Sequence, residues 1–167
     1  MRVSRALVFR CGVRDCRASD VRRLEWYGMH WADRELIRRA FRRAARGSVR
    51  MLVADADGHP VGQIWVDLVA KAREGVAVLW ALRIHPMFGG KGLGTRLMAA
   101  AERVARSAGL ESTEVGVERG NAAAQRLYRR LGYARCGEGG NSTSWRRPDG
   151  KRTRIRFDYG TFRKSLV

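Results

Sequence analysis

The sequence has 167 residues, 45% hydrophobic and 30% charged, and its 34 lysines and arginines against 16 aspartates and glutamates give a formal charge of +18. This length predicts a single domain over residues 1–167 that can bury a core without a metal or disulfides. No apolar run approaches the roughly 18 residues that a membrane-spanning helix needs, because arginines interrupt each candidate. The first ten residues hold only a four-residue apolar stretch, too short for a secretory signal, so we expect a cytoplasmic protein with no membrane partner.

The positive charge raises the question of a polyanionic partner such as nucleic acid. Only four of the basic residues are lysines, and the arginines are spread from Arg2 to Arg163. This dispersal favours solvated basic faces over one nucleic-acid site, although it leaves such a partner open.

The three cysteines, Cys11, Cys16 and Cys136, are an odd number and too sparse for a disulfide scaffold. We expect small buried thiols rather than a Cys11–Cys16 bridge. The three histidines are scattered along the chain, so the sequence predicts no metal site.

Hydrophobic periodicity and turn residues predict the elements in chain order. Strands are expected at 6–13, 49–54, 61–69, 76–84, 113–117, 145–147 and 153–157, and helices at 19–27, 32–45, 93–108 and 122–131. Turn sequences at 55–60 and 147–151 indicate two hairpins, whereas the glycine-rich stretch 137–142 is expected to be flexible. The order β-α-α-β-β-β-α-β-α-β-β predicts one mixed α/β domain.

The segment from Ile84 to Leu97 turns a predicted strand into a helix through four glycines at positions 89, 90, 92 and 94. The free amides and the positive dipole end of a helix start attract anions, and glycines let a phosphate approach the backbone. Lys91 adds a positive charge. A Walker loop needs Ser or Thr where this chain has Gly92, and a dinucleotide fingerprint needs Gly where it has Leu97. The turn therefore predicts a phosphate site of neither kind.

Two patterns in the chain resemble motifs of the GCN5-related N-acetyltransferases (GNAT). The first, similar to motif A of that family, is Ile84-x-Pro86-x-x-x-Gly90-x-Gly92-Leu93-Gly94-x-x-Leu97. The second, similar to motif B, is Asn121-x-x-Ala124-x-x-Leu127-Tyr128-x-x-Leu131-Gly132-Tyr133. With the adjoining strands they cover residues 76–133. Gly89 departs from the family pattern, which usually has Arg or Gln at this position.

The resemblance implies a central, mostly antiparallel sheet with a splayed pair of parallel strands, flanked by about four helices. It also implies acetyl-CoA as co-substrate, without a metal, with its pantetheine arm pairing with backbone groups of the strand that enters the glycine turn. The implied cofactor-binding residues are Leu82, Ile84, Gly89, Gly90, Lys91, Gly92, Leu93, Gly94, Thr95 and Asn121. Asn121 is equally suited to cap the helix that follows it.

Tyr128 is implied as the general acid that protonates the departing CoA thiolate, although a core tyrosine would show the same spacing. The general base stays open among Glu118, Asp67 and Glu25. The aromatic segment 26–31 suits either an acceptor pocket or the core. The net charge disfavours a polycationic acceptor.

We therefore expect an acetyl-CoA-dependent N-acetyltransferase that moves an acetyl group to a primary amine by direct transfer in a ternary complex. Direct transfer is expected because no cysteine lies in a recognisable nucleophile setting. The amine belongs to a small molecule or a protein, and a homodimer is left open. The alternative is a basic nucleic-acid-binding module on an acyltransferase-like fold with an idle cleft.

Overall fold

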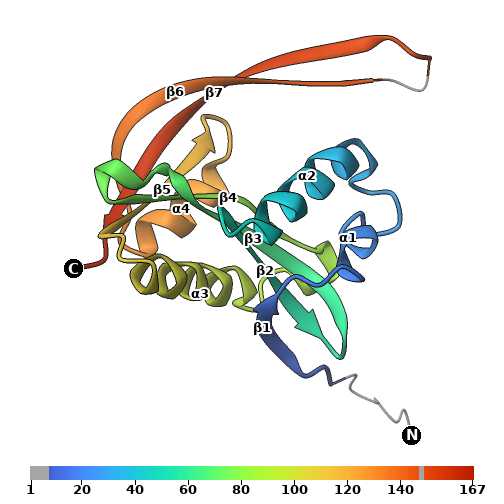
Figure 1. Cartoon of the computed structure of the whole chain (residues 1–167), viewed down its shortest axis with the longest axis horizontal. Coiled ribbons are helices and arrows are strands. Elements are labelled where there is room, and N and C mark those ends of the chain that lie inside the picture. The colour runs from blue at the N-terminus through green and yellow to red at the C-terminus, as the bar shows by residue number, and fades with distance from the viewer. Residues whose placement is uncertain (1–7, 147–148) are drawn as a thin grey trace, which may run out of the picture.

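Seven strands form one sheet in the order β1-β2-β3-β4-β5-β7-β6 (Figure 1). This computed structural model describes residues 8–146 and 149–167, with the backbone alone for 141, 143–146, 155 and 157. The strands are β1 (Cys11–Asp15), β2 (Val49–Ala56), β3 (His59–Lys71), β4 (Val76–Ile84), β5 (Ser112–Glu118), β6 (Ala134–Arg146) and β7 (Arg152–Ser165). Neighbouring strands run antiparallel except β4 and β5, which are parallel. The predicted sheet type is confirmed.

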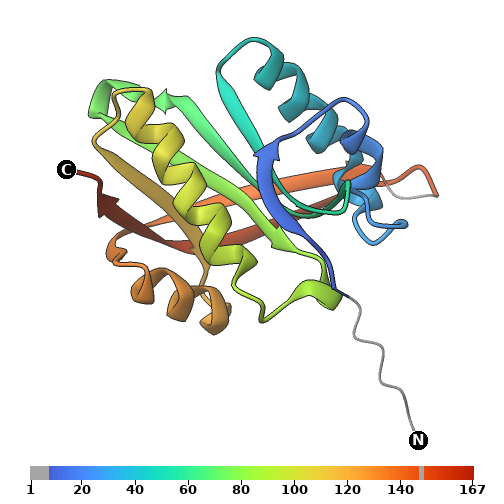
Figure 2. The same cartoon turned by 90° about the horizontal axis from the view of Figure 1, so that it is seen from below.

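Helices cover both faces of the sheet. They are α1 (Asp20–Arg23), α2 (Arg34–Ala45), α3 (Leu93–Ser107) and α4 (Ala122–Arg130), with short 3-10 helices η1 (Trp31–Asp33), η2 (Ala72–Glu74) and η3 (Pro86–Phe88). The alternation of β2 separates two cores, because Val49, Met51 and Val53 pack with α1 and α2 while Leu52 and Ala54 pack with α3 and α4. Figure 2 shows α3 and α2 on these opposite faces.

The C-terminal hairpin is much longer than the sequence predicts. Strands were expected only at 145–147 and 153–157, but pairing runs from Ala134↔Arg163 to Arg146↔Arg152. The stretch 137–142, expected to be flexible, lies inside β6. Its glycines give no alternating pattern, and backbone hydrogen bonds to β7 hold it in the sheet. Figure 1 shows this ribbon extending beyond the other strands.

The N-terminal elements also differ from prediction. The first helix spans Asp20–Arg23 rather than 19–27, because Trp26 and Tyr27 adopt positive φ angles of 42° and 57° that end the helix. Residues 6 and 7 of the first predicted strand, and residues 147 and 148 of the second predicted turn, lie outside the described residues.

The cysteines are free thiols, but the expectation that they are buried is wrong. Cys11 and Cys16 are half-buried, and Cys136 is exposed. None of the helices in the described ranges is long and apolar enough to cross a membrane.

Candidate functional site

The parallel pair β4 and β5 separates towards its C-terminal end. The pairing runs from Val76↔Ser112 to Leu79↔Val115 and stops there. Beyond it, Trp80–Ile84 keeps β3 as its neighbour and Gly116–Glu118 keeps β7. We call these two segments the splayed ends. Among the described residues, their facing backbone groups have no strand partner, so an extended amide-containing ligand could hydrogen-bond to them.

A bulge in β4 lies where the pairing with β5 stops. Trp65 pairs with Trp80 and Gln63 with Arg83, so one more residue lies between the pairs on β4 than on β3. Ala81, inside the bulge, has a φ of 55°, which is uncommon for a residue with a side chain. The bulge redirects β4 away from β5, and the sequence carries no signal for it.

The glycine turn follows β4 through η3 and leads into α3. Gly90 and Gly92 have φ angles of 69° and 76°, and an added Cβ at either position would meet no other atom within 4 Å. The first intrahelical hydrogen bond runs from Arg96 N to Gly92 O, so the amides of 93–95 precede the helical ladder. This arrangement leaves an open backbone surface with free donors at the positive end of the helix dipole, suited to a phosphate.

The other residues of this turn are accessible but less specific. Lys91 is exposed, and its Nζ lies 3.3 Å from the Met87 carbonyl oxygen. Gly89 has φ −62° and ψ 156°, so its backbone dihedral angles do not require glycine, although an added Cβ would lie 3.3 Å from the Pro86 carbonyl oxygen. Thr95 is half-buried, and Leu93 is buried and anchors the start of α3 in the core.

The two sequence motifs meet in space. An added Cβ on Gly94, at the start of α3, would lie 3.8 Å from the side chain of Leu127 on α4. Asn121 caps α4, since its Oδ1 accepts a hydrogen bond from the Ala124 amide at 3.0 Å. The capping role considered for Asn121 is therefore present. The side chains of Leu82 and Ile84 pack against the core below α3.

Tyr128 and Tyr133 differ in how their hydroxyl groups are used, although their rings lie 5.8 Å apart. The Tyr133 hydroxyl is hydrogen-bonded to Thr113 (2.8 Å) and Glu102 (3.1 Å). Within the described chain, the Tyr128 hydroxyl has no such partner. The Tyr128 side chain is 7% exposed, and burial raises its pKa to about 12. Its hydroxyl is therefore a protonated donor without a structural task.

The three candidate bases have different surroundings. Asp67 pairs with Arg43 at 2.6 Å and also accepts two backbone amides, and Glu25 accepts two hydrogen bonds of 2.8 Å from Arg34. Glu118 is exposed at the end of β5 and forms no ion pair with another described residue. Of the three, Glu118 alone keeps an available carboxylate in the described structure.

The sequence analysis did not identify one aromatic residue that lies beside the splayed ends. The Tyr159 ring lies so close to Gly116 and Gly139 that an added Cβ would be 3.0 Å and 2.6 Å from its atoms. Tyr159 pairs with Glu118 across β5 and β7. A glycine inside a strand often marks such a close approach, so Gly116 and Gly139 were the signal available in the sequence.

Comparison with known proteins identifies the family. Residues 17–133, which include the glycine turn, the splayed ends and α4, match the family model described as "Acetyltransferase (GNAT) family". The chain belongs to the GNAT family. The resemblance seen in the two motifs is thus confirmed.

Sequence relatives of this GNAT chain include two mycothiol acetyltransferases. One, from Clavibacter michiganensis, is 35% identical over 83 residues, which are 50% of this chain and 26% of the relative. The other, from Streptomyces avermitilis, is 33% identical over 82 residues, 49% of this chain and 26% of the relative. The chain therefore matches about a quarter of the length of each relative.

Solved structures share the GNAT fold over nearly the whole chain. An N-acetyltransferase from Staphylococcus aureus Mu50 has a TM-score of 0.72 at 13% identity, covering 95% of this chain and 99% of that one. The paia N-acetyltransferase from Thermoplasma acidophilum, in complex with coenzyme A, has a TM-score of 0.68 at 18% identity, covering 93% and 99%. The yncA structure from Salmonella typhimurium, with its cofactor acetyl-CoA, has a TM-score of 0.71 at 19% identity, covering 95% of each chain.

Proposed function

We propose that this protein transfers the acetyl group of acetyl-CoA to a primary amine, directly and within a ternary complex. The observation that carries the proposal is that the parallel pair separates where β4 leads into the open glycine turn and β5 leads into α4, which carries Tyr128. Family membership and the neighbours bound to coenzyme A or acetyl-CoA support it.

The cofactor would follow the backbone from β4 to α3. The amides of 90–95, with Lys91 beside them, suit the pyrophosphate. Backbone groups of Leu82 and Ile84 suit the amides of the pantetheine arm, and Asn121 borders the same opening from the α4 side. When bound, acetyl-CoA supplies a thioester whose carbonyl carbon accepts an amine. A β4 amide near that carbonyl oxygen would stabilise its developing negative charge.

The transfer forms one N–C bond and breaks one C–S bond. The departing thiolate takes a proton, and Tyr128 is suited to donate it because its hydroxyl is protonated and has no partner in the described chain. The amine must lose a proton, and Glu118 is suited to receive it because its carboxylate has no ion-pair partner among the described residues. Solvent then restores both residues.

The first test is thermal unfolding with acetyl-CoA, with heparin and ATP as polyanion controls. A ligand at 100 times its Kd stabilises by about 2.7 kcal/mol, or roughly 5–10 °C for a domain of this size. We expect a shift of that order with acetyl-CoA and little with the controls, followed by amine-dependent release of coenzyme A. Equal shifts with all three would reflect net charge alone. No shift at millimolar acetyl-CoA would contradict the proposal and favour a basic binding module with an idle cleft.

A further inference from the structure

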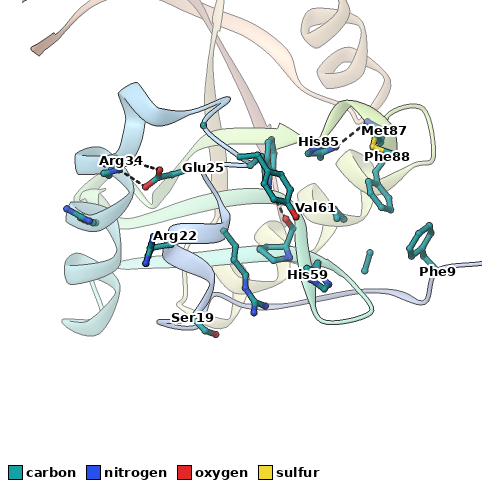
Figure 3. Close-up of a pocket in the computed structure, with 17 residues that line it drawn as sticks. Phe9, Ser19, Arg22, Glu25, Arg34, His59, Val61, His85, Met87 and Phe88 are labelled. Atoms are coloured by element: carbon teal, nitrogen blue, oxygen red, sulfur yellow. Dashed lines mark hydrogen bonds and ion pairs between the residues drawn. The ribbon is translucent and has the colours of Figure 1, made fainter. Parts of the chain in front are cut away.

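A cavity of about 980 Å³ lies between α1, the start of α2, the β2–β3 turn and η3 (Figure 3). None of the described residues that line it belongs to β4, β5, α4 or β7, so it is separate from the splayed ends. Its wall meets the candidate site at η3 and His85, the residue that follows β4. Its volume is at the upper end of the about 300–1,000 Å³ typical of small-molecule sites.

One side of the cavity is a row of aromatic rings. Edge-to-face contacts join Trp26 to His85 (centroids 5.4 Å apart), His85 to Phe88 (6.2 Å) and Phe88 to Phe9 (5.4 Å). The Trp26 indole also donates a 2.8 Å hydrogen bond to the Pro60 carbonyl, which fixes the ring. This row offers apolar surface to a flat ligand.

The other side is cationic. Figure 3 shows Arg22, Arg34 and Glu25 on the side opposite Phe9 and Phe88. Four arginines line the cavity, at positions 22, 23, 34 and 38, and Glu25 is the single carboxylate among the described lining residues.

Glu25 is occupied by one of these arginines. Arg34 binds both of its oxygens at 2.8 Å, and in the described structure Glu25 forms no hydrogen bond to the other three arginines. The pKa of Glu25 is lowered, first by the Arg34 hydrogen bond and further by the positive charges of Arg34, Arg38 and Arg22. Arg22 and Arg38 both line the cavity. Neither Arg22 nor Arg38 has a carboxylate partner among the described residues.

We propose that this cavity binds a small aromatic anion, whose flat body packs against Trp26, His85 and Phe88 and whose carboxylate or phosphate group binds Arg22 and Arg38. Arg22 and Arg38 are exposed and form no ion pair with another described residue, so an anion could bind them without breaking an ion pair, while the row of rings offers apolar surface to the body of the ligand. The inference does not depend on acetyl transfer.

The test compares two fluorescent dyes with the same aromatic skeleton. 1-Anilinonaphthalene-8-sulfonate carries an anionic group, and N-phenyl-1-naphthylamine does not. We expect saturable binding of one sulfonate dye per chain, at least tenfold tighter than binding of the neutral dye. Equal affinity for the two dyes would overturn the proposal.

Variants locate the anionic group. The double variant Arg22→Gln/Arg38→Gln should bind the sulfonate dye at least tenfold more weakly, whereas its affinity for the neutral dye should change less than twofold. The unchanged affinity for the neutral dye would also show that the cavity remains folded. The control Arg39→Gln/Arg46→Gln removes the same charge from exposed positions of α2 and its C-terminal cap that do not line the cavity. It should bind both dyes like the wild type. Equal weakening by both double variants would show attraction by net charge and overturn the proposal.

Competition identifies the head group. Naphthalene-2-carboxylate and 2-naphthyl phosphate should displace the sulfonate dye, and the stronger competitor names the preferred anion. If neither displaces it, the proposal is wrong. Saturating acetyl-CoA should leave the dye bound, and displacement by acetyl-CoA would assign the dye site to the cofactor instead.

Discussion

Replacing Tyr128 by Phe should slow acetyl transfer without unfolding the protein. The Tyr128 hydroxyl has no hydrogen-bond partner in the described chain, so its removal leaves no buried group unpaired there. We expect the free energy of unfolding to change by less than about 0.5 kcal/mol. Because burial raises the pKa of Tyr128 to about 12, the phenol stays protonated through neutral pH and above it. Any loss of activity at alkaline pH that comes from deprotonation of Tyr128 should therefore occur near pH 12.

The raised pKa also limits how much Tyr128 can contribute. A thiol has a pKa of about 8.5, so complete proton transfer from a phenol with a pKa of about 12 is uphill by roughly 5 kcal/mol. Before its proton moves to the sulfur, Tyr128 would therefore stabilise the developing thiolate mainly through a hydrogen bond, worth about 1.5–3 kcal/mol. This predicts that kcat falls roughly 10- to 150-fold in the Phe variant.

The assay follows coenzyme A release with a thiol reagent, together with acetyl-CoA binding and thermal unfolding. Tyr133→Phe is the matched control, since the Tyr133 hydroxyl is bonded to Thr113 and to the buried Glu102. Its loss should cost about 2 kcal/mol and lower Tm by roughly 4–8 °C, with kcat close to wild type. An unchanged kcat in Tyr128→Phe with acetyl-CoA still bound would refute the reasoning, as would equal losses of kcat in the two variants.

Gly89→Arg should tighten acetyl-CoA binding about fivefold, as an exposed ion pair of about 1 kcal/mol would, because the backbone dihedral angles of Gly89 suit any residue. Gly89→Ala is the control for the Cβ itself, which would lie 3.3 Å from a backbone carbonyl oxygen. If the two variants bind acetyl-CoA equally in titrations, the guanidinium group of the Arg variant does not contribute to binding. Glu118→Gln should lower kcat about 100-fold near neutral pH in steady-state assays while acetyl-CoA binding persists, and an unchanged rate would remove Glu118 from the mechanism. Burial alone would raise the pKa of Asp20, but the hydrogen bonds that its carboxylate accepts from Arg14 and from a backbone amide lower this pKa overall. The stability that Asp20 contributes is therefore present above about pH 3.9 and is lost as the pH falls below that value. In the Asp20→Asn variant, the free energy of unfolding should therefore change less with pH in the acid range, and it should be about 2 kcal/mol lower than that of the wild type at pH 7. If both proteins lose stability equally as the pH falls, Asp20 is not responsible.

The sequence predicted the centre of the fold better than its ends. The strand predicted at 76–84 has those bounds in the structure, and the helices after it begin at Leu93 and Ala122 as expected. These segments carry continuous apolar or amphipathic patterns that end in turn residues. The hairpin of β6 and β7 lacks such a pattern, and cross-strand hydrogen bonds rather than local preference hold it together. The bulge at Ala81 depends in the same way on packing between distant segments.

The excess of arginines determines which carboxylates of this protein can accept a proton. At least eleven of the sixteen acidic residues pair with Lys or Arg in the described structure. The sequence could not separate Glu118 from Asp67 and Glu25, because pairing with distant arginines is decided by the fold. An ion-paired carboxylate is a poor proton acceptor, since its neighbouring cation favours the charged form. Among these three carboxylates we therefore propose Glu118 as the general base, and it lies within the splayed end of β5.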